Sequence, residues 1–490
     1  MRARRLAAAL AVLLGAGGAA QAAEPAPCRI DGLAREVLCG SVARPLDPAR
    51  PEGIGIEVHY VVVPALARRK LPDPVFPLAG GPGQSAIDLA GAMMGVFARL
   101  NNRRDIVFVD QRGTGRSAPL DCEEPAAQPL AESADVGRQL QKLRECRERL
   151  LQRPHVKEAA SLGFYTTTLA MQDLDAVRQA LGARRINLVG ASYGTRAALE
   201  YQRQFPQALR RSVLDGVAPP DMVLPASSGV DAQAALDALF AACHAEPACE
   251  RRWSALRQDW EALLASLPRE ATVADPLTGA PQRFTLTRDV VLAVVRAPLY
   301  VPALAAALPA AIEAAAQSRF EPLVTLGGAL SRRGAPGIAT GMHFSVICAE
   351  DMPRLARANA APARDFGAGL APLYEQACAF WPRGAVPEAF YTVGRSATPV
   401  LLLSGGLDPA TPPRHARRVA EALGAQARHV IVPNAGHGLL GSGCVPDLLF
   451  RFIDAAGDAD ALALDAACAT TMPRPPAFLP PQAFAREPAR

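Results

Sequence analysis

The sequence predicts an α/β protein built around a mostly parallel β-sheet. Short, apolar, β-branched runs recur along the chain with helical patterns between them, which is typical of parallel strands joined by helices. Two further observations add to this prediction. One apolar run is followed by a serine between glycines, and a long stretch of the chain has no such runs. Strands are expected at residues 57–63, 75–78, 106–109, 186–189, 212–214, 400–403 and 429–432. Helices are expected at residues 168–181 and 414–423.

Between about residues 219 and 397 the sequence lacks the recurring apolar, β-branched runs that predict strands. Apolar residues there recur at helical spacing, and an Ala/Leu-rich stretch follows. The spacing is that of a buried helix face, formed by Trp253, Leu256, Trp260, Leu263 and Leu264. We therefore expect a helical cap inserted into the sheet domain.

This interpretation divides the mature chain into four parts. The expected parts are a first core part at 23–220, the cap at 221–396, a second core part at 397–470 and a proline-rich tail at 471–490. The proline content predicts that this tail runs extended over the surface.

The first residues have the pattern of a secretory signal peptide. Arg2, Arg4 and Arg5 precede an apolar segment, and Ala20-Gln21-Ala22 provides small residues for cleavage. The prediction is a signal peptide at residues 1–22, since an uncleaved anchor needs nearer 20 apolar residues, the span of about 30 Å of hydrocarbon. We therefore expect export to the periplasm or the medium, with no membrane association after cleavage.

The net charge of the chain limits the kinds of partner that it is expected to bind, and its cysteine content indicates the cellular compartment. The formal net charge of +5 includes the three arginines of the signal segment, and so small a balance argues against nucleic acid as a partner. Ten cysteines in an exported chain predict disulfides rather than metal ligands. They form five neighbouring couples: Cys28/Cys39, Cys122/Cys146, Cys243/Cys249, Cys348/Cys378 and Cys444/Cys468. Free buried thiols are the alternative.

The most informative stretch is Gly190-Ala191-Ser192-Tyr193-Gly194, directly after the expected strand at 186–189. A helical pattern follows, so the stretch predicts a sharp strand-to-helix turn with the serine at its apex. The serine backbone is strained there, and side chains two residues away would collide with it, which explains both glycines. The turn lifts Ser192 Oγ to where a base can reach it. A glycine-rich connection without chemistry is the alternative.

A serine hydroxyl needs a base, and the base needs an orienting acid. In this arrangement the order along the chain is serine, acid, histidine. Asp408 follows the expected strand at 400–403, and His437 follows the strand at 429–432 between two glycines. Both would emerge at the carboxyl ends of parallel strands, where such sheets place their sites. The predicted catalytic residues are therefore Ser192, Asp408 and His437.

Rivals exist for the acid and the base. Asp215 ends another expected strand, and an aspartate before proline, as at Asp408, is also a common turn former. The rival bases are His415 in a helical pattern, His429 at the start of a strand and His343 in the cap.

The oxyanion of an acyl transfer needs two backbone N–H donors. One is expected from Tyr193, the residue after the nucleophile. The other is expected from the loop Gly80-Gly81-Pro82-Gly83-Gln84, which follows the strand at 75–78. Gly81 is the predicted donor.

A further string, DQRGTGRS at residues 110–117, completes a recognisable set. Together with the loop at Gly80, the elbow and Asp408/His437, it resembles the α/β-hydrolase peptidases of the prolyl aminopeptidase group. The secreted tripeptidyl-aminopeptidase branch is the most similar. The resemblance spans roughly residues 55–220 and 340–445, and the DQRGTGRS string is its most specific element.

This resemblance implies an α/β-hydrolase fold, exopeptidase activity, a helical cap over the site and no cofactor. It also implies a C-terminal segment typical of the tripeptidyl branch, within residues 397–470. The prolyl enzymes usually carry histidine before the first glycine of the oxyanion loop, where this chain has Ala79. Together with the longer cap, that difference leaves proline specificity in doubt. The DQRGTGRS string is expected to be architectural, with Asp110 and the arginines bracing the loop beside the nucleophile.

An aminopeptidase must recognise a charged substrate amine, which calls for carboxylates held by the cap. Glu350 and Asp351 lie in a segment, residues 345–351, that resembles one typical of the tripeptidyl branch. They are the predicted amine-binding residues. The alternative is that they are ordinary loop or helix-cap acids.

The function predicted from these observations is a secreted serine aminopeptidase acting on peptides with a free N-terminus. A carboxylesterase is the second candidate, because the same three residues hydrolyse esters. A catalytically silent binding protein on the same scaffold is the third. A dehalogenase or epoxide hydrolase would carry aspartate at the elbow, where this chain has Ser192.

Overall fold

The computed structural model describes residues 24–122, 132, 135–274, 279–330, 337–358 and 361–479. The predicted signal peptide and the last part of the predicted tail lie outside these residues. Within them, no helix has the length and apolar character needed to cross a membrane.

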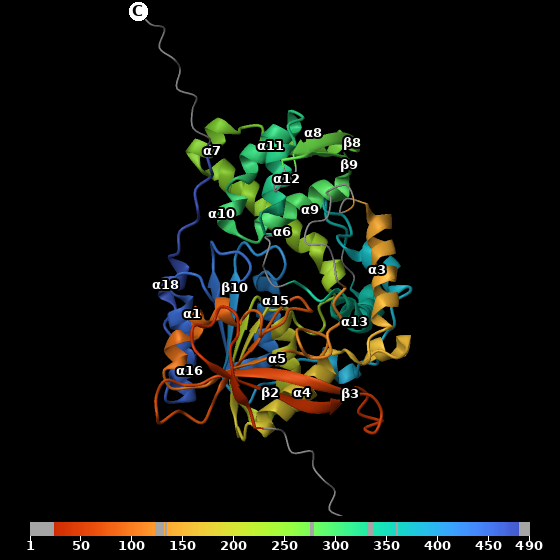
Figure 1. The fold of residues 1–490 in the computed structure, drawn as a ribbon. Helices are drawn as coiled ribbons and strands as arrows, with labels where there is room; N and C mark the ends of the chain where they lie inside the picture. Colours follow the sequence, from red (N-terminus) through yellow and green to blue (C-terminus); the bar gives the residue numbers. More distant parts are fainter. Residues whose placement is uncertain are drawn as a thin grey trace, which may run out of the picture.

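Nine strands of the described chain form one sheet, in the order β1-β2-β3-β5-β4-β6-β7-β10-β11 (Figure 1). Their bounds are β1 Ala26–Cys28, β2 Val37–Pro45, β3 Gly55–Val63, β4 Val75–Leu78, β5 Ile106–Val109, β6 Ile186–Ala191, β7 Leu209–Asp215, β10 Val400–Gly405 and β11 Ala427–Val432. From β5 to β11 the neighbours are parallel, whereas β1, β2 and β3 pair antiparallel at one edge. All seven expected strands are present, and the α/β-hydrolase fold is confirmed.

The two strands at the antiparallel edge, β1 and β2, were not predicted from the sequence. β2 lies at the antiparallel edge, and most of its residues are only partly buried, so the sequence lacks the continuous apolar run of an interior strand. The interior strands β4, β5 and β10 are buried at every position, and these were the easiest to predict.

Helices cover both faces of the sheet. One face packs against α4, α5 and α15, and the other against α1 and α16. Alternate residues of β10 separate between these two hydrophobic cores: Val400 and Leu402 belong to one, Leu401 and Leu403 to the other. The helix bounds are α1 Ala90–Asn101, α4 Thr167–Ala180, α5 Tyr193–Gln204, α15 Pro413–Leu423 and α16 Val445–Asp454.

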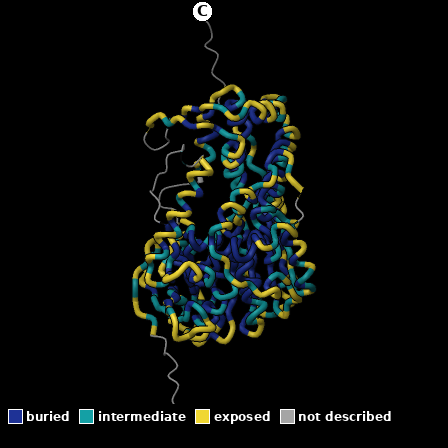
Figure 2. Tube along the Cα trace, turned by 90° about the vertical axis from the view of Figure 1, so that its right-hand side faces the viewer, coloured by how far each residue is buried: buried dark blue, intermediate teal, exposed yellow. Residues whose placement is uncertain are grey.

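A long insertion between the paired strands β7 and β10 carries most of the remaining helices (Figure 1). Its first part has a hydrophobic core of its own, to which all five residues of the predicted helix face belong. The elements are α6 Leu224–Ala245, α7 Pro247–Arg252, α8 Leu256–Ala265, α9 Arg288–Leu299, α10 Pro302–Ala305, α11 Leu308–Ala316 and α12 Glu321–Gly327. Figure 2 shows this part above the sheet, with buried segments concentrated around the sheet.

The cap is mostly helical, as expected, but it also contains a strand pair that was not predicted. β8 Arg269–Ala274 and β9 Pro281–Leu286 form an antiparallel hairpin there. Ala271 and Val273 point into the cap core while their neighbours on either side are more exposed. Because this alternation of buried and exposed positions spans only a few residues, it could not be distinguished in the sequence from the surrounding helical pattern.

The second part of the insertion packs with the sheet instead of with the cap. α13 Thr340–Glu350 and α14 Ala371–Cys378 are joined by the disulfide Cys348–Cys378. Met342, Val346 and Ile347 of α13 belong to the same hydrophobic core as α4 and α5. This part therefore brings its residues close to the elbow.

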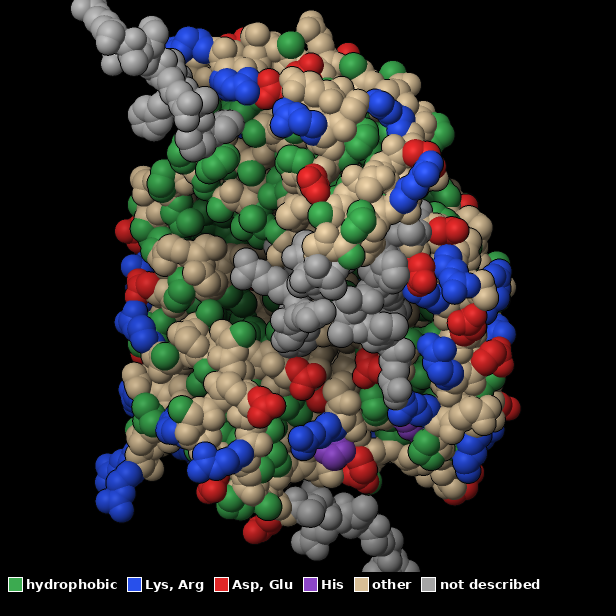
Figure 3. Space-filling view, turned by 45° about the horizontal axis from the view of Figure 1, so that its top comes forward, with side chains coloured by type: hydrophobic (Ala, Val, Ile, Leu, Met, Phe, Trp, Pro, Cys, Tyr) green, Lys and Arg blue, Asp and Glu red, His purple; other side chains and the backbone are tan. Residues whose placement is uncertain are grey.

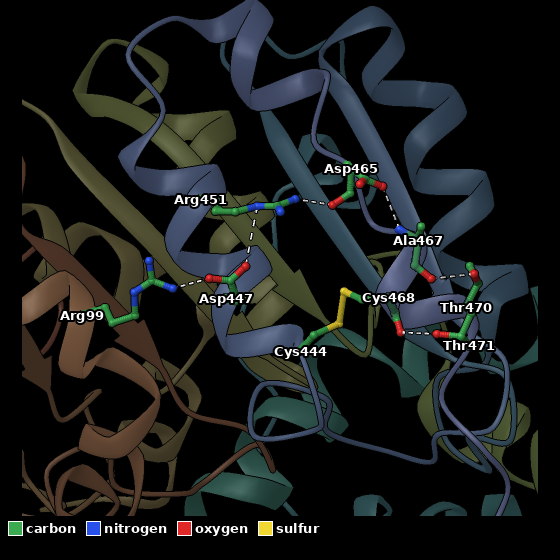
Figure 4. The surroundings of a disulfide bond; sticks show 9 residues. All are labelled: Arg99, Cys444, Asp447, Arg451, Asp465, Ala467, Cys468, Thr470 and Thr471. Atoms are coloured by element: carbon green, nitrogen blue, oxygen red, sulfur yellow. Dashed lines mark hydrogen bonds and ion pairs between the residues drawn. A yellow bond between two sulfur atoms is a disulfide. The ribbon is translucent and has the colours of Figure 1, made fainter.

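All five predicted cysteine couples are disulfides in this structure, and the described residues contain no free cysteine. Figure 4 shows Cys444–Cys468, which joins the start of α16 to α18 Ala467–Thr470. Ion pairs of Asp447 with Arg99 and Arg451 surround it.

After α18 the chain has no helix or strand up to residue 479, and this segment connects the core to the cap (Figure 1). Asn434 Nδ2 donates to the Met472 carbonyl at 2.9 Å, and Phe478 N donates to the Ala306 carbonyl at 2.8 Å. A mostly apolar cavity of about 480 Å³ lies between this segment and the cap. In the space-filling view, hydrophobic side chains gather in a hollow between the upper and lower halves of the molecule (Figure 3).

Candidate active site

The elbow forms between β6 and α5 as predicted. Ser192 adopts φ 55° and ψ −122°, a conformation that is unfavourable for a residue with a side chain. A Cβ on Gly190 would overlap the carbonyl of Gly194, and a Cβ on Gly194 would overlap the carbonyl of Leu78. Both flanking glycines are therefore required by close backbone approach. The Ser192 N–H donates to the carbonyl of Asp215 at 2.8 Å, which ties the turn to β7.

Asp408 and His437 meet at the carboxyl ends of β10 and β11. His437 Nδ1 lies 2.8 Å from Asp408 Oδ2. The same carboxylate accepts hydrogen bonds from the backbone N–H groups of Ala410 and Thr411 and from Thr411 Oγ1. The Asp408 side chain is fully buried, whereas that of His437 keeps 15% of its surface exposed.

This environment shifts both pKa values in the direction that favours an ion pair. Burial acts to raise the pKa of Asp408, but His437 and the two backbone N–H groups hold it below its ordinary value. Burial likewise acts to lower the pKa of His437, and the Asp408 carboxylate overcomes it and raises that pKa. A protonated His437 is therefore stabilised by a neighbour that itself stays ionised.

Tyr300, at the end of α9, holds the histidine loop from the cap side. Its carbonyl accepts a hydrogen bond from His437 N at 2.9 Å, and its ring lies 5.2 Å from the imidazole in an edge-to-face arrangement. Tyr300 and Thr411 were not predicted from the sequence. Thr411 could have been found as a hydroxyl three residues after the acid, whereas nothing local connects Tyr300 to a loop more than one hundred residues away.

The rival acid Asp215 has a different place. Its Oδ2 accepts hydrogen bonds from the N–H groups of Leu439 (2.7 Å) and Leu440 (3.0 Å), two and three residues after His437. It is not hydrogen-bonded to the imidazole in this structure, and burial raises its pKa to about 6. Asp215 thus supports the loop that carries His437.

The rival histidines have other partners. His415 Nε2 lies 2.9 Å from Asp231 Oδ2, and His429 Nε2 lies 3.0 Å from Ser404 Oγ. His343 Nε2 lies 2.6 Å from Tyr374 Oη, with its Nδ1 near the Pro82 carbonyl. None of these three is hydrogen-bonded to Asp408.

The glycine loop after β4 lies directly against the nucleophile. A Cβ on Gly80 would come within 3.2 Å of Ser192 Cβ. Gly81 has φ +108°, a backbone conformation that favours glycine. Tyr193 is the first residue of α5, so its N–H is one of the free amides at that helix start. The roles of Gly81 and Tyr193 as oxyanion donors remain predictions.

Glu350 and Asp351, the predicted amine-binding residues, lie in a buried network with Arg196 and Thr167. Asp351 accepts hydrogen bonds from Arg196 Nη1 (2.8 Å) and from the N–H of Leu224 (2.7 Å). Glu350 accepts from the N–H (2.7 Å) and Oγ1 (3.0 Å) of Thr167 and lies 3.5 Å from Arg196 Nη1. All three charged side chains have no exposed surface.

The amine-binding prediction for Glu350 and Asp351 is therefore not supported by this geometry. Both carboxylates are bound to Arg196, one turn beyond the nucleophile in α5, and neither side chain has exposed surface. One guanidinium compensates only one of the two acids, and burial raises the pKa of Glu350 to about 7. A network of this kind holds α13 against α5. Nothing in the sequence indicated that an arginine on another helix would bind both acids.

The DQRGTGRS string braces the same region. Asp110 accepts hydrogen bonds from Ser85 Oγ (2.7 Å) and from the N–H groups of Ile87 and Arg116. Burial raises the pKa of this carboxyl to about 6, although these three hydrogen bonds oppose the shift. Arg112 is buried and donates two hydrogen bonds to Asp173. The expected architectural role is consistent with these contacts.

Comparison with known proteins agrees with this fold. Residues 73–269 match the family described as alpha/beta hydrolase fold, and residues 362–468 match the family described as TAP-like protein. Serine protease Hip1 of Mycobacterium tuberculosis (strain H37Rv) is 27% identical over 460 residues, covering 83% of this chain and 86% of that protein.

Two further relatives carry different names. Tripeptidyl aminopeptidase of Streptomyces lividans is 32% identical over 248 residues, which cover 48% of this chain and 43% of that protein. Carboxylesterase B of Mycobacterium tuberculosis (strain CDC 1551) is 28% identical over 436 residues, covering 80% of this chain and 79% of that protein. With the sheet order and the elbow, these matches show an α/β-hydrolase fold and a serine hydrolase similar to serine peptidases, with a TAP-like C-terminal part.

Proposed function

We propose that this protein is an exported serine aminopeptidase that hydrolyses peptide bonds near a free N-terminus. The observation that carries the proposal is the 2.8 Å contact between His437 Nδ1 and Asp408 Oδ2 at the sheet edge where β6 turns into the serine elbow. A base held in this way, next to a raised serine, is the arrangement that acyl transfer requires.

The steps follow from the roles of these side chains. His437 takes the Ser192 proton as Oγ attacks the scissile carbonyl, and Asp408 stabilises the imidazolium that forms. The N–H groups of Gly81 and Tyr193 stabilise the oxyanion. His437 then gives its proton to the leaving amine, which leaves an acyl-enzyme on Ser192. A water molecule, activated by the same histidine, releases the acyl group and restores the serine.

Peptide rather than ester specificity is supported by the names of two relatives. Serine protease Hip1 covers most of the chain, and tripeptidyl aminopeptidase is the one whose name includes a preference for the N-terminus. Glu350 and Asp351 are buried and bound to Arg196, so the proposal does not assign the substrate amine to them.

Export is supported by two independent features. The sequence begins with the pattern of a signal peptide, and the structure has five disulfides. Disulfides persist in oxidising compartments and are rare in the cytosol.

A carboxylesterase is the second candidate, favoured by the match to Carboxylesterase B over 80% of this chain. One substrate screen separates the two functions. It would compare free-amine peptide amides with the same peptides N-acetylated and with short acyl esters. The aminopeptidase proposal predicts turnover of the free-amine peptides, with a large loss on acetylation. Rapid hydrolysis of esters without turnover of any peptide would favour the esterase.

A further inference from the structure

A cavity of about 520 Å³ opens between α9 of the cap and α14 of the lower insertion. Its wall also includes residues 365–370 and two positions on α3 Val136–Leu150. Two arginines of one helix, Arg288 and Arg296, line it two turns apart. They differ in what they contact.

Arg288 is an exposed residue at the start of α9, and its guanidinium donates to the Asp365 carbonyl at 3.0 Å. Arg296 is half-buried, and its Nε is a buried donor without a hydrogen-bond partner. Among the described residues, no carboxylate forms an ion pair with Arg296. Two acids line the cavity: Asp289, on the same helix, and Asp365, which is already bound by Gln233, Trp260 and Arg364.

Arg296 also lies close to the predicted catalytic histidine. Its guanidinium carbon is 5.3 Å from the centre of the Tyr300 ring, and that ring is 5.2 Å from the His437 imidazole. The guanidinium is therefore about 10 Å or less from the imidazole centre. An unpaired arginine that lines a cavity so near a reactive centre needs a partner, because a buried donor left without one is costly.

We propose that Arg296 binds a carboxylate of the peptide substrate, and that the cavity beside it is the subsite for that part of the peptide. The inference rests on the proposed peptidase function. A planar guanidinium matches a carboxylate in a two-pronged geometry, and such charge-assisted hydrogen bonds are strong. An extended peptide advances about 3.3–3.6 Å per residue, so the carboxylate belongs two or three residues from the scissile bond.

Two substrate groups supply this chemistry at that distance: the C-terminal carboxylate of a short peptide, or the side chain of an aspartate or glutamate. The alternative is a purely structural role for Arg296, because a guanidinium beside the Tyr300 ring can stabilise the loop that carries His437. The two roles predict different results. A structural role affects all peptides alike, whereas a carboxylate ligand distinguishes acids from their amides.

The test measures how strongly short alanine-based peptides slow the labelling of Ser192 by a fluorophosphonate, because this readout does not require peptide cleavage. One series compares peptides of three to six residues as free acids and as C-terminal amides. A second series, all C-terminal amides, compares glutamate with glutamine at each position. In the wild type, one acid is expected to protect at a concentration about tenfold to hundredfold lower than its amide, the range for a hydrogen bond to a charged group.

Arg296→Met should abolish this preference, and Arg296→Lys should retain part of it, since a lysine keeps the charge but not the fork. Arg288→Met is the matched control on the same helix and the same cavity wall, and it should keep the full preference. Thermal unfolding checks that each variant is folded, and the lysine variant decides the question if the methionine variant is not. A preference in the first series identifies the C-terminal carboxylate, and one in the second identifies an acidic side chain.

Equal protection by acids and amides in the wild type would overturn the inference. So would a preference that survives in Arg296→Met, or one that Arg288→Met removes equally, because the cause would then be the general charge of the cavity. If the acids protect through Arg296 but no peptide is cleaved, the inference stands and the peptidase proposal fails.

Discussion

Two clusters of buried acids lie in the region of the serine elbow, and their partners differ. In one, Asp408 contacts His437, whose side chain keeps 15% of its surface exposed. In the other, Glu350 and Asp351 contact Arg196, and none of the three side chains has exposed surface. The first pair contains a partly exposed histidine, whereas the second has one guanidinium for two carboxylates, and burial raises the pKa of Glu350 to about 7 although Arg196 opposes the shift.

The chemical role of an acid near an active site therefore depends on its partner. The partner of Asp408 is a partly exposed histidine that can gain and lose a proton. Glu350 and Asp351, equally buried and close in sequence to α13 residues that pack on α5, are fully used in holding two helices together.

The largest effect is expected from breaking the first cluster. Asp408→Asn removes the charge that stabilises the imidazolium and changes the hydrogen bond that fixes the tautomer, so kcat should fall about 10⁴-fold, as in the serine protease case. Steady-state kinetics on the best substrate of the screen measures it. Asp215→Asn is the comparison variant, with a smaller loss expected because that carboxylate binds only backbone N–H groups. A larger loss from Asp215→Asn would reverse the assignment.

Breaking the second cluster should affect stability rather than specificity. Arg196→Met leaves two buried carboxylates without their cation, and removing one partner of such a group costs about 3–5 kcal/mol in the free energy of unfolding. Denaturant unfolding measures this, with Arg99→Met as control. Arg99 and Asp447 form an exposed ion pair, for which a loss of at most about 1 kcal/mol is expected.

The same comparison tests the amine-binding hypothesis that the structure disfavours. Asp351→Asn should lower stability without changing the ratio of KM values for free-amine and acetylated peptides. A selective rise in KM for free-amine peptides, at unchanged stability, would restore Asp351 as an amine ligand.

A smaller and graded effect is expected from pH. Because the folded-state pKa of His437 is raised above 6.5, kcat/KM should rise with pH through a value above 6.5 as the imidazole becomes neutral. Stability changes in the opposite direction: the proton bound more tightly in the folded state stabilises the protein below pH 6.5, and this contribution is lost as the pH rises through the folded pKa. Glu350→Gln should leave the position of the activity limb unchanged. A limb below pH 6.5 in the wild type would contradict the contact with Asp408.

The fold and the central residues could be predicted because their signals are local. Continuous apolar runs marked the interior strands, and glycines on both sides of Ser192 marked a turn that the structure shows to need them. Chain order then paired Asp408 with His437, and these two are in contact. The cysteine couples were also local, and each is joined.

What could not be predicted depends on contacts between distant segments. The Arg196 network joins α5 to residues that lie more than 150 positions further along the chain, and no sequence pattern in either segment indicates this contact. The contact of Tyr300 with the histidine loop is of the same kind. The hairpin β8–β9 was missed because a short alternation inside a helical region resembles an irregular helix.

The most direct test of the account is the site of fluorophosphonate labelling, mapped by mass spectrometry of tryptic peptides. The account predicts one adduct on the wild-type protein, at Ser192, with strongly slowed labelling in His437→Ala and none in Ser192→Ala. The Ser192→Ala protein should remain folded by thermal unfolding. An adduct on another serine, or labelling of Ser192→Ala at the wild-type rate, would contradict it.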